Sequence, residues 1–243
     1  MSEPRPPVRA VLFDLDDTLF DHQYSTRAAL EAVRGCHDCF RAVAFDELDR
    51  THARFLEELH HDVTFGRIAL DDARRERFRR LFEAMGVAAD ASLTAMAAAA
   101  YRERYQTVRR AIDGAGALLT RIRSRARVGI VSNNLLEEQA EKLRHCGLDR
   151  FIDTLVVSGE AGVSKPDPRI FRIALDRLGC EPAEAVMIGD SWTADVAGAR
   201  AAGIRAIWFN PAGRERPDAS VPRLASLAPP DVPMRMIFDA DWD

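Results

Sequence analysis

The sequence predicts an α/β protein with a parallel sheet covered by helices on both faces and a helical segment inserted after the first strand. In residues 128–209 short apolar stretches alternate with helical patterns, which is typical of parallel sheets. Residues 22–106 show helical periodicity and no convincing strand. We therefore expect a sheet domain of residues 1–21 and 107–243 and a four-helix domain of residues 22–106.

The first strand is expected at residues 10–13, which are apolar and mostly branched or aromatic. It leads directly into Asp14 and Asp16, whose side chains leave the same face if the two-residue period of the strand continues. Neighbouring carboxylates repel each other without a cation, and their oxygens suit a hard ion such as Mg²⁺. The stretch therefore indicates a Mg²⁺ site, with an acidic turn after a core strand as the alternative.

Four helices are expected in the inserted segment. They cover residues 26–33, 46–59, 71–82 and 92–105. The third carries five arginines that can attract an anionic substrate, but charges spread round a helix are more typical of a solvated face. These residues are Arg74, Arg75, Arg77, Arg79 and Arg80.

The alternating region supplies the remaining elements. Strands are expected at residues 128–131, 155–157, 185–188 and 206–209, and helices at residues 135–146, 168–178 and 193–202. Asp167 and Pro168 form a strong helix start, because the aspartate can cap the helix and proline suits the first helical position. Residues 211–243 contain several prolines and indicate no clear element.

Polar side chains follow the predicted strands. Ligands of open parallel sheets bind at the carboxyl ends of the strands, and here those ends carry Asp14, Asp16, Ser132 and Asp190. Lys165 lies in a loop just before a capped helix and can reach the same place. A single serine after a strand is usually a helix cap, and a single loop lysine is usually solvated. The order of all five residues is the stronger signal.

Composition limits the classes of partner. The chain has 243 residues, of which 47% are apolar and 30% charged, and a formal net charge of -4, so bulk charge gives no attraction to nucleic acid or anionic lipid. No apolar run approaches the ~20 residues of a membrane span, and the first residues lack a signal-peptide pattern. We expect a cytoplasmic monomer or homodimer that binds neither nucleic acid nor membranes.

The motifs resemble those of the haloacid dehalogenase-like (HAD) hydrolases, in particular the phosphatase branch with a helical cap after the first strand of a Rossmann-like sheet. The matching stretches are DLDDT at residues 14–18, Ser132 at a strand end, Lys165 in SKPDP and GDSWTAD at residues 189–195. They span most of the chain in the family's order. The first and last stretches are the more specific ones.

The resemblance implies a mechanism. Asp14 would be the nucleophile that forms an aspartyl-phosphate, and Asp16 would be the general acid and then the general base. Lys165 would balance charge, because with Mg²⁺ it offsets the repulsion between an anionic nucleophile and an anionic substrate.

The resemblance also implies two sets of ligands. The substrate phosphate would be bound by Thr18, Ser132 and Asn133. Mg²⁺ would be held by Asp14, the backbone carbonyl of Asp16 and Asp190, with Asp195 supporting the metal or Lys165.

The expected function is Mg²⁺-dependent hydrolysis of a small phosphorylated metabolite, with the helical cap setting substrate choice. The wording of the motifs is most similar to that of nucleoside 5'-monophosphatases and acylneuraminate phosphatases. A phosphosugar phosphatase or mutase remains an alternative, because a mutase uses the same pair of aspartates. A 2-haloacid dehalogenase is disfavoured, because dehalogenases lack a carboxylate in the place of Asp16. A non-enzymatic binding protein is disfavoured because every motif residue is present.

Overall fold

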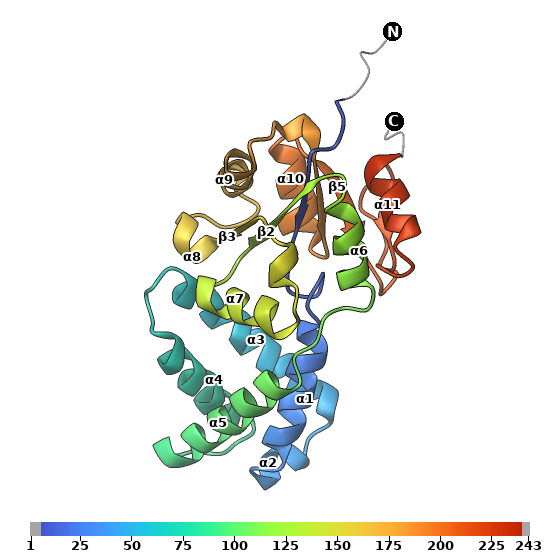
Figure 1. Ribbon diagram of the computed structural model, residues 1–243. Coiled ribbons are helices and arrows are strands. Elements are labelled where there is room, and N and C mark those ends of the chain that lie inside the picture. Colours follow the sequence, from blue (N-terminus) through green and yellow to red (C-terminus); the bar gives the residue numbers. More distant parts are fainter. Residues whose placement is uncertain (1–5, 240–243) are drawn as a thin grey trace. The chain divides into compact units, whose positions relative to one another are not determined.

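The computed structural model describes residues 6–239 and divides the chain into two compact units (Figure 1). One unit is formed by the chain up to Asp21 and from Arg110 onward, and it contains the sheet. The other is His22–Arg109 and is helical. The second boundary follows Arg109, whereas the sequence pattern places it after residue 106.

The first unit contains the predicted parallel α/β sheet, which within residues 6–239 has six strands in the order β3-β2-β1-β4-β5-β6. The strands are β1 (Ala10–Phe13), β2 (Arg127–Ser132), β3 (Thr154–Val157), β4 (Ala185–Gly189), β5 (Arg205–Phe209) and β6 (Arg223–Leu224). β1 pairs with both β2 and β4, so the residues that follow β1 lie next to the ends of its two neighbours. This Rossmann-like arrangement confirms the predicted fold class.

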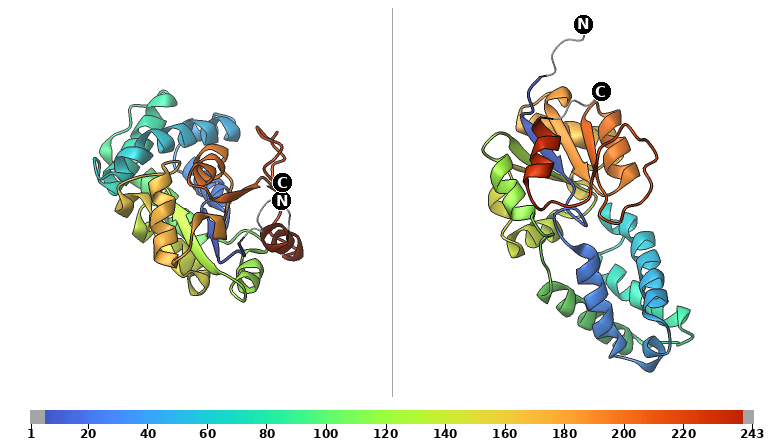
Figure 2. Two further views of the ribbon diagram at one scale, coloured as in Figure 1. Left: turned by 90° about the horizontal axis from the view of Figure 1, so that it is seen from above. Right: turned by 90° about the vertical axis from the view of Figure 1, so that its right-hand side faces the viewer.

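Helices cover both faces of this sheet (Figure 2). α9 (Pro168–Leu178) and α10 (Gly198–Ala201) form one core cluster with alternate residues of the central strands, such as Ala10 and Leu12. α6 (Ala115–Ile122) contacts β2 and α11 (Asp231–Phe238) on the other face. Because both faces are covered, all four residues of β1 are fully buried, which explains their unbroken apolar run.

The other helical elements of the first unit connect these strands and helices along the chain. They are α7 (Leu136–His145), η1 (Asp149–Phe151), α8 (Ser158–Ala161), η2 (Pro182–Glu184) and η3 (Trp192–Ala197). α9 begins as predicted: the Asp167 side chain accepts a hydrogen bond from the N–H of Arg169, and Pro168 is the first helical residue.

The helix predicted at residues 193–202 differs from the observed structure. Trp192–Ala197 forms a π-helical segment, and only Gly198–Ala201 is α-helical. The N–H of Ser191 donates to the carboxylate of Asp195, and the N–H of Ala194 donates to the hydroxyl of Ser191. The side chains of Asp195 and Ser191 thus accept hydrogen bonds from backbone N–H groups of this segment. Short π-helical turns of this kind are frequent at functional sites.

The second unit is built from α1 (His22–Arg34), α2 (Asp38–Arg41), α3 (Phe45–Thr64), α4 (Leu70–Ala84) and α5 (Ala91–Thr107). The four long helices correspond to the predicted ones. The short α2 has no counterpart in the prediction, and the side chain of His37 caps it by accepting from the N–H of Cys39. Phe40 of this helix packs against Phe82, which ties α2 to α4.

The five arginines of α4 do not form a single solvated face. Four of them pair with acidic residues at the surface: Arg74 with Asp71, Arg75 with Asp72, and Arg79 and Arg80 with Glu76. Arg77 differs, because it is buried and lies over the ring of Tyr101 at 4.9 Å. The interpretation as a solvated face therefore fits Arg75, Arg79 and Arg80, whereas the Arg74 side chain is only 17% exposed and Arg77 is buried.

Among residues 6–239, none of the helices is both long enough and apolar enough to cross a membrane.

Candidate active site

The site begins where β1 ends, at Asp14. The N–H of Asp14 donates to the carbonyl of Ile188 in β4 at 3.0 Å, which fixes its backbone against the neighbouring strand. Lys165 Nζ lies 2.6 Å from Asp14 Oδ1 and 2.6 Å from Asp195 Oδ1. All three side chains are buried, so one ammonium group joins two carboxylates that come from distant parts of the sequence.

The charges of this cluster are unbalanced. Burial raises the pKa of Asp14 well above its usual 3.8, and the carboxylates of Asp195 and Asp190 raise it further, although Lys165 opposes them. Burial, with Asp195 and Asp17, raises the pKa of Asp190 to about 7. Burial lowers the pKa of Lys165, but Asp14 and Asp195 outweigh it, so the net shift is upward and the ammonium stays charged. The excess of negative charge favours a bound cation.

Three carboxylates can share one ion. Single oxygens of Asp14, Asp190 and Asp195 all lie within 4.8 Å of one another. Hard carboxylate oxygens are the ligand type that Mg²⁺ takes, so these residues fit a magnesium ion. Both oxygens of Asp195 are already engaged, by Lys165 and by the N–H of Ser191. These contacts suit Asp195 to the supporting role that the resemblance implies, and Asp14 and Asp190 stay the predicted direct ligands.

A tight turn follows Asp14. Asp17 has a positive φ of 59°, a conformation that aspartate tolerates better than most residues. The N–H groups of Leu19 and Phe20 both donate to the carbonyl of Leu15. The turn brings Thr18 Oγ1 to 3.4 Å from Asp14 Oδ2, so the hydroxyl predicted to bind phosphate lies beside the predicted nucleophile.

Asp16 points toward α7. Lys142 Nζ lies 2.6 and 2.8 Å from its two carboxylate oxygens. Gln139 Nε2 donates to Asp16 Oδ2 at 3.0 Å, and Asn134 Nδ2 does so at 3.3 Å. The Asp16 carboxylate is not in the group of three acids that can share an ion, so only its backbone carbonyl remains a predicted metal ligand.

Ser132 and Asn133 follow β2, as the sequence predicts. Ser132 is buried, and its Oγ accepts from Gln139 Nε2 at 2.5 Å. The Asn133 side chain contacts the backbone of Lys165 twice: its Nδ2 donates to the carbonyl at 2.9 Å, and its Oδ1 accepts from the N–H at 2.7 Å. The Asn133 side chain thus holds the Lys165 loop, and its role in phosphate binding remains a prediction.

Comparison with known protein families identifies the family of this chain. Residues 8–203 match the family described as haloacid dehalogenase-like hydrolase. The chain belongs to this family. It is 35% identical over 239 residues to the phosphoserine phosphatase of Thermus thermophilus, an alignment that covers 88% of this chain and 93% of the relative. It is 31% identical over 212 residues to the human N-acylneuraminate-9-phosphatase, with 85% of this chain and 84% of the relative covered.

A solved structure of a HAD hydrolase has a similar fold. The HAD-hydrolase YfnB of Bacillus subtilis, bound to magnesium, superposes with a TM-score of 0.71 at 26% identity, and the match covers 91% of this chain and 96% of that chain. The resemblance seen in the motifs is confirmed, and the chain is a hydrolase of the HAD family whose relatives include phosphatases.

Two side chains of this HAD hydrolase were missed by the sequence analysis. Gln139 and Lys142 are three residues apart on the helix after Ser132, so they share a helix face, and both are buried against Asp16. A compositional signal was present. Of the 34 Lys and Arg residues of the chain, Lys142 and Lys165 are the only lysines. Each of them pairs with a predicted catalytic aspartate.

Gly189 makes room for the acid cluster. This glycine ends β4 immediately before Asp190, and a Cβ built on it would collide with the carboxylate of Asp195. Only a residue without a side chain lets the backbone of β4 approach Asp195 so closely.

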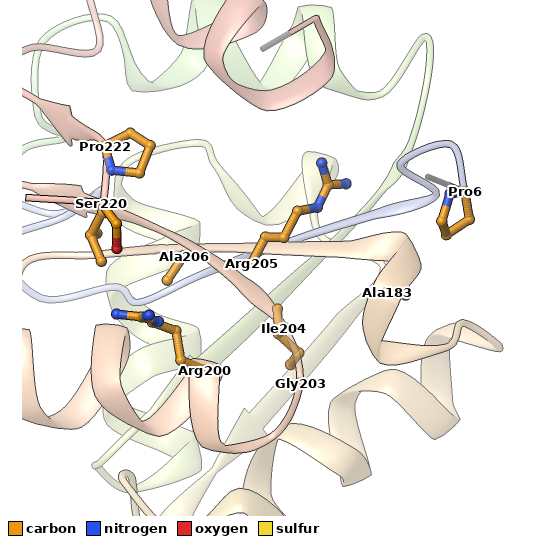
Figure 3. A pocket seen from close by; sticks show the side chains of 10 residues that line it. Pro6, Ala183, Arg200, Gly203, Ile204, Arg205, Ala206, Ser220 and Pro222 are labelled. Atoms are coloured by element: carbon orange, nitrogen blue, oxygen red, sulfur yellow. The ribbon is translucent and has the colours of Figure 1, made fainter. Parts of the chain in front are cut away.

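A hollow of about 430 Å³ lies elsewhere in the same unit (Figure 3). Its lining includes Gly203, Arg205 and Pro222, and Arg205 is the first residue of β5. The hollow is therefore at the amino ends of the parallel strands, whereas the acids lie at the carboxyl ends. It is separate from the candidate active site.

Proposed function

We propose that the chain is a Mg²⁺-dependent phosphomonoester hydrolase that acts on a small phosphorylated metabolite through an aspartyl-phosphate on Asp14. The observation that carries the proposal is the contact of Asp14 with Lys165 inside an acidic cluster that fits one magnesium ion. The phosphatase relatives support the reaction class.

The proposed first half-reaction transfers the phosphoryl group to Asp14. A carboxylate oxygen of Asp14 forms a bond to phosphorus while the bond from phosphorus to the leaving oxygen breaks. The leaving oxygen takes a proton from Asp16. Mg²⁺, when bound by Asp14 and Asp190, supplies positive charge to the phosphate oxygens.

The second half-reaction regenerates the enzyme. Asp16, now a carboxylate, accepts a proton from water as the water oxygen attacks phosphorus, and the bond between phosphorus and Asp14 breaks. The hydroxyls of Thr18 and Ser132 and the ammonium of Lys165 would stabilise charge on the phosphoryl oxygens in both steps.

The alternatives differ at Asp16 and in the substrate. Hydrolysis at carbon with a halide leaving group needs no proton donor, so the carboxylate two residues after the nucleophile favours a phosphatase over a dehalogenase. A phosphosugar mutase would transfer the phosphoryl group to a second sugar hydroxyl in place of water. We propose a nucleoside 5'-monophosphate as one candidate substrate, which the helical unit would select. We also propose that the protein acts in the cytoplasm as a monomer or homodimer.

The test is a panel of phosphorylated metabolites and one aryl phosphate, assayed for phosphate release with Mg²⁺ and with EDTA. The proposal expects release that depends on Mg²⁺ and is lost in Asp14→Asn, with circular dichroism showing that the variant is folded. Release that persists in EDTA, wild-type turnover in Asp14→Asn, or no release from any substrate would each contradict it.

A further inference from the structure

Three polar side chains hold the carboxylate of Asp16, and they belong to Asn134, Gln139 and Lys142. We propose that Lys142 and Gln139 are positioning residues that fix the orientation of the Asp16 side chain on the α7 side of the active site. This inference rests on the proposed function, because it assigns Asp16 the proton transfers.

Lys142 makes the strongest contact. Its ammonium nitrogen reaches both oxygens of Asp16, at 2.6 and 2.8 Å, and its side chain is only 3% exposed. A buried ammonium group is costly unless it is paired, so the burial of Lys142 depends on its contact with Asp16. The contact places a positive charge directly against the carboxylate of Asp16.

The residue type supports the same conclusion. The chain uses arginine for all but two of its 34 Lys and Arg residues, and those two lysines contact Asp14 and Asp16. Lysine is a compact point charge, whereas arginine presents a wide planar fork. The two sites at which the chain uses the compact cation are therefore the two predicted catalytic aspartates.

Gln139 connects Asp16 with Ser132, one of the predicted phosphate ligands. Its single amide nitrogen donates to Ser132 Oγ at 2.5 Å and to Asp16 Oδ2 at 3.0 Å. Its Oε1 is buried and has no hydrogen-bond partner among residues 6–239, so the two contacts of the nitrogen fix the amide. Because Ser132 Oγ accepts from Gln139, its own proton stays available for a substrate phosphate.

Lys142→Met should affect kcat much more than KM. Loss of the ammonium should lower kcat about tenfold or more, because general acid–base catalysis contributes roughly 10²–10⁴-fold and depends on placement. The KM for an aryl phosphate should change by less than about threefold, because Lys142 does not touch the predicted phosphate ligands directly. Arg144→Met is the matched control, because Arg144 is exposed on the same helix, and it should leave both constants unchanged.

The deciding experiment is a double-mutant cycle with Lys142→Met and Asp16→Asn, measured with Mg²⁺ and an aryl phosphate that has a poor leaving group. If Lys142 acts through Asp16, Lys142→Met should cost less than about twofold in the Asp16→Asn background. Losses that multiply would overturn the proposal. If the Met variant is unfolded by circular dichroism, Lys142→Arg serves in the same cycle. Wild-type turnover in the same assay tests the proposed function separately, so the two failures are distinguishable.

Discussion

The ammonium nitrogen of Lys165 lies 2.6 Å from the carboxylate of Asp14, although the two residues are 151 positions apart. Two neighbours set this contact. Asp195 holds the other side of the ammonium group, and Asn133 holds the backbone of Lys165 through two hydrogen bonds. These contacts join the ends of β1 and β2 to the loop before α9, so the fold brings the positive charge of Lys165 next to Asp14.

Lys165→Met should abolish most of the activity. It removes the cation between two buried carboxylates, and the loss of one charge stabiliser in a closed site typically costs on the order of 10²–10³ in kcat. The measurement is the steady-state rate with saturating Mg²⁺. The matched control is Arg169→Met, because Arg169 is exposed and pairs only locally with Asp167. Equal rates in both variants would show that Lys165 is not needed for the chemistry.

Gly189→Ala should disturb the acid cluster. The new Cβ would collide with the carboxylate of Asp195, and overpacking of this kind costs about 1–3 kcal/mol. We expect a lower free energy of unfolding in urea and weaker activation by Mg²⁺. Gly116→Ala on α6 is the control, because nothing lies within 4 Å of its added Cβ. A Gly189→Ala protein as stable and active as Gly116→Ala would contradict the close packing of Gly189 against Asp195.

The stability of the helical unit should fall as pH falls below about 6.5, because of His52. Burial, with the charge of Arg77, lowers the pKa of His52 well below its usual 6.5. The unfolded chain therefore binds a proton at a higher pH than the folded chain, so the free energy of unfolding decreases toward acid, by up to about 1.4 kcal/mol per pH unit.

His52→Phe tests this sign. Phenylalanine keeps a ring beside Phe78 and Tyr101, which His52 contacts, but cannot take up a proton. The measurement is urea unfolding at several pH values between about 7 and 5. The wild type should lose stability faster than His52→Phe over this range, and parallel losses would show that His52 does not carry the effect.

Part of this structure follows from the sequence and part does not. The positions of the proposed site residues Asp14, Ser132 and Asp190 were predictable because each lies at the end of an apolar strand, and parallel strands bring such ends together. Lys142 was not, because a residue on a helix contacts Asp16 only after α7 has packed. β6 escaped prediction for a different reason: a strand of two residues has too few positions to show a period.

Arginines raise the same difficulty. In one dimension the five arginines of α4 look alike, since each is separated from an acid by a few residues. Arg77 differs in lying four residues from the buried Ala73 and Leu81, and the packing of α4 against α5 places it over Tyr101. The π-helical turn at Trp192–Ala197 was likewise unpredictable, because it depends on the side-chain contacts of Asp195.

The helical unit should select substrates without supplying the chemistry. We expect Tyr24→Ala and Arg67→Met to change kcat/KM for a natural substrate by more than they change hydrolysis of a small aryl phosphate, which contacts few selecting residues. Arg75→Met is the control, because Arg75 pairs with Asp72 at the surface. Equal losses on both substrates would assign these residues to folding or to the common chemistry.

The central claim is that Asp14 carries the phosphoryl group, and the direct measurement is to trap it. The enzyme is mixed with Mg²⁺ and a substrate that bears a radiolabelled phosphate, quenched in acid during turnover, digested and mapped by mass spectrometry. We predict label on the peptide that contains Asp14 in the wild type, and none in Asp14→Asn. Wild-type turnover with no label on the protein, or with label on another residue, would contradict the account.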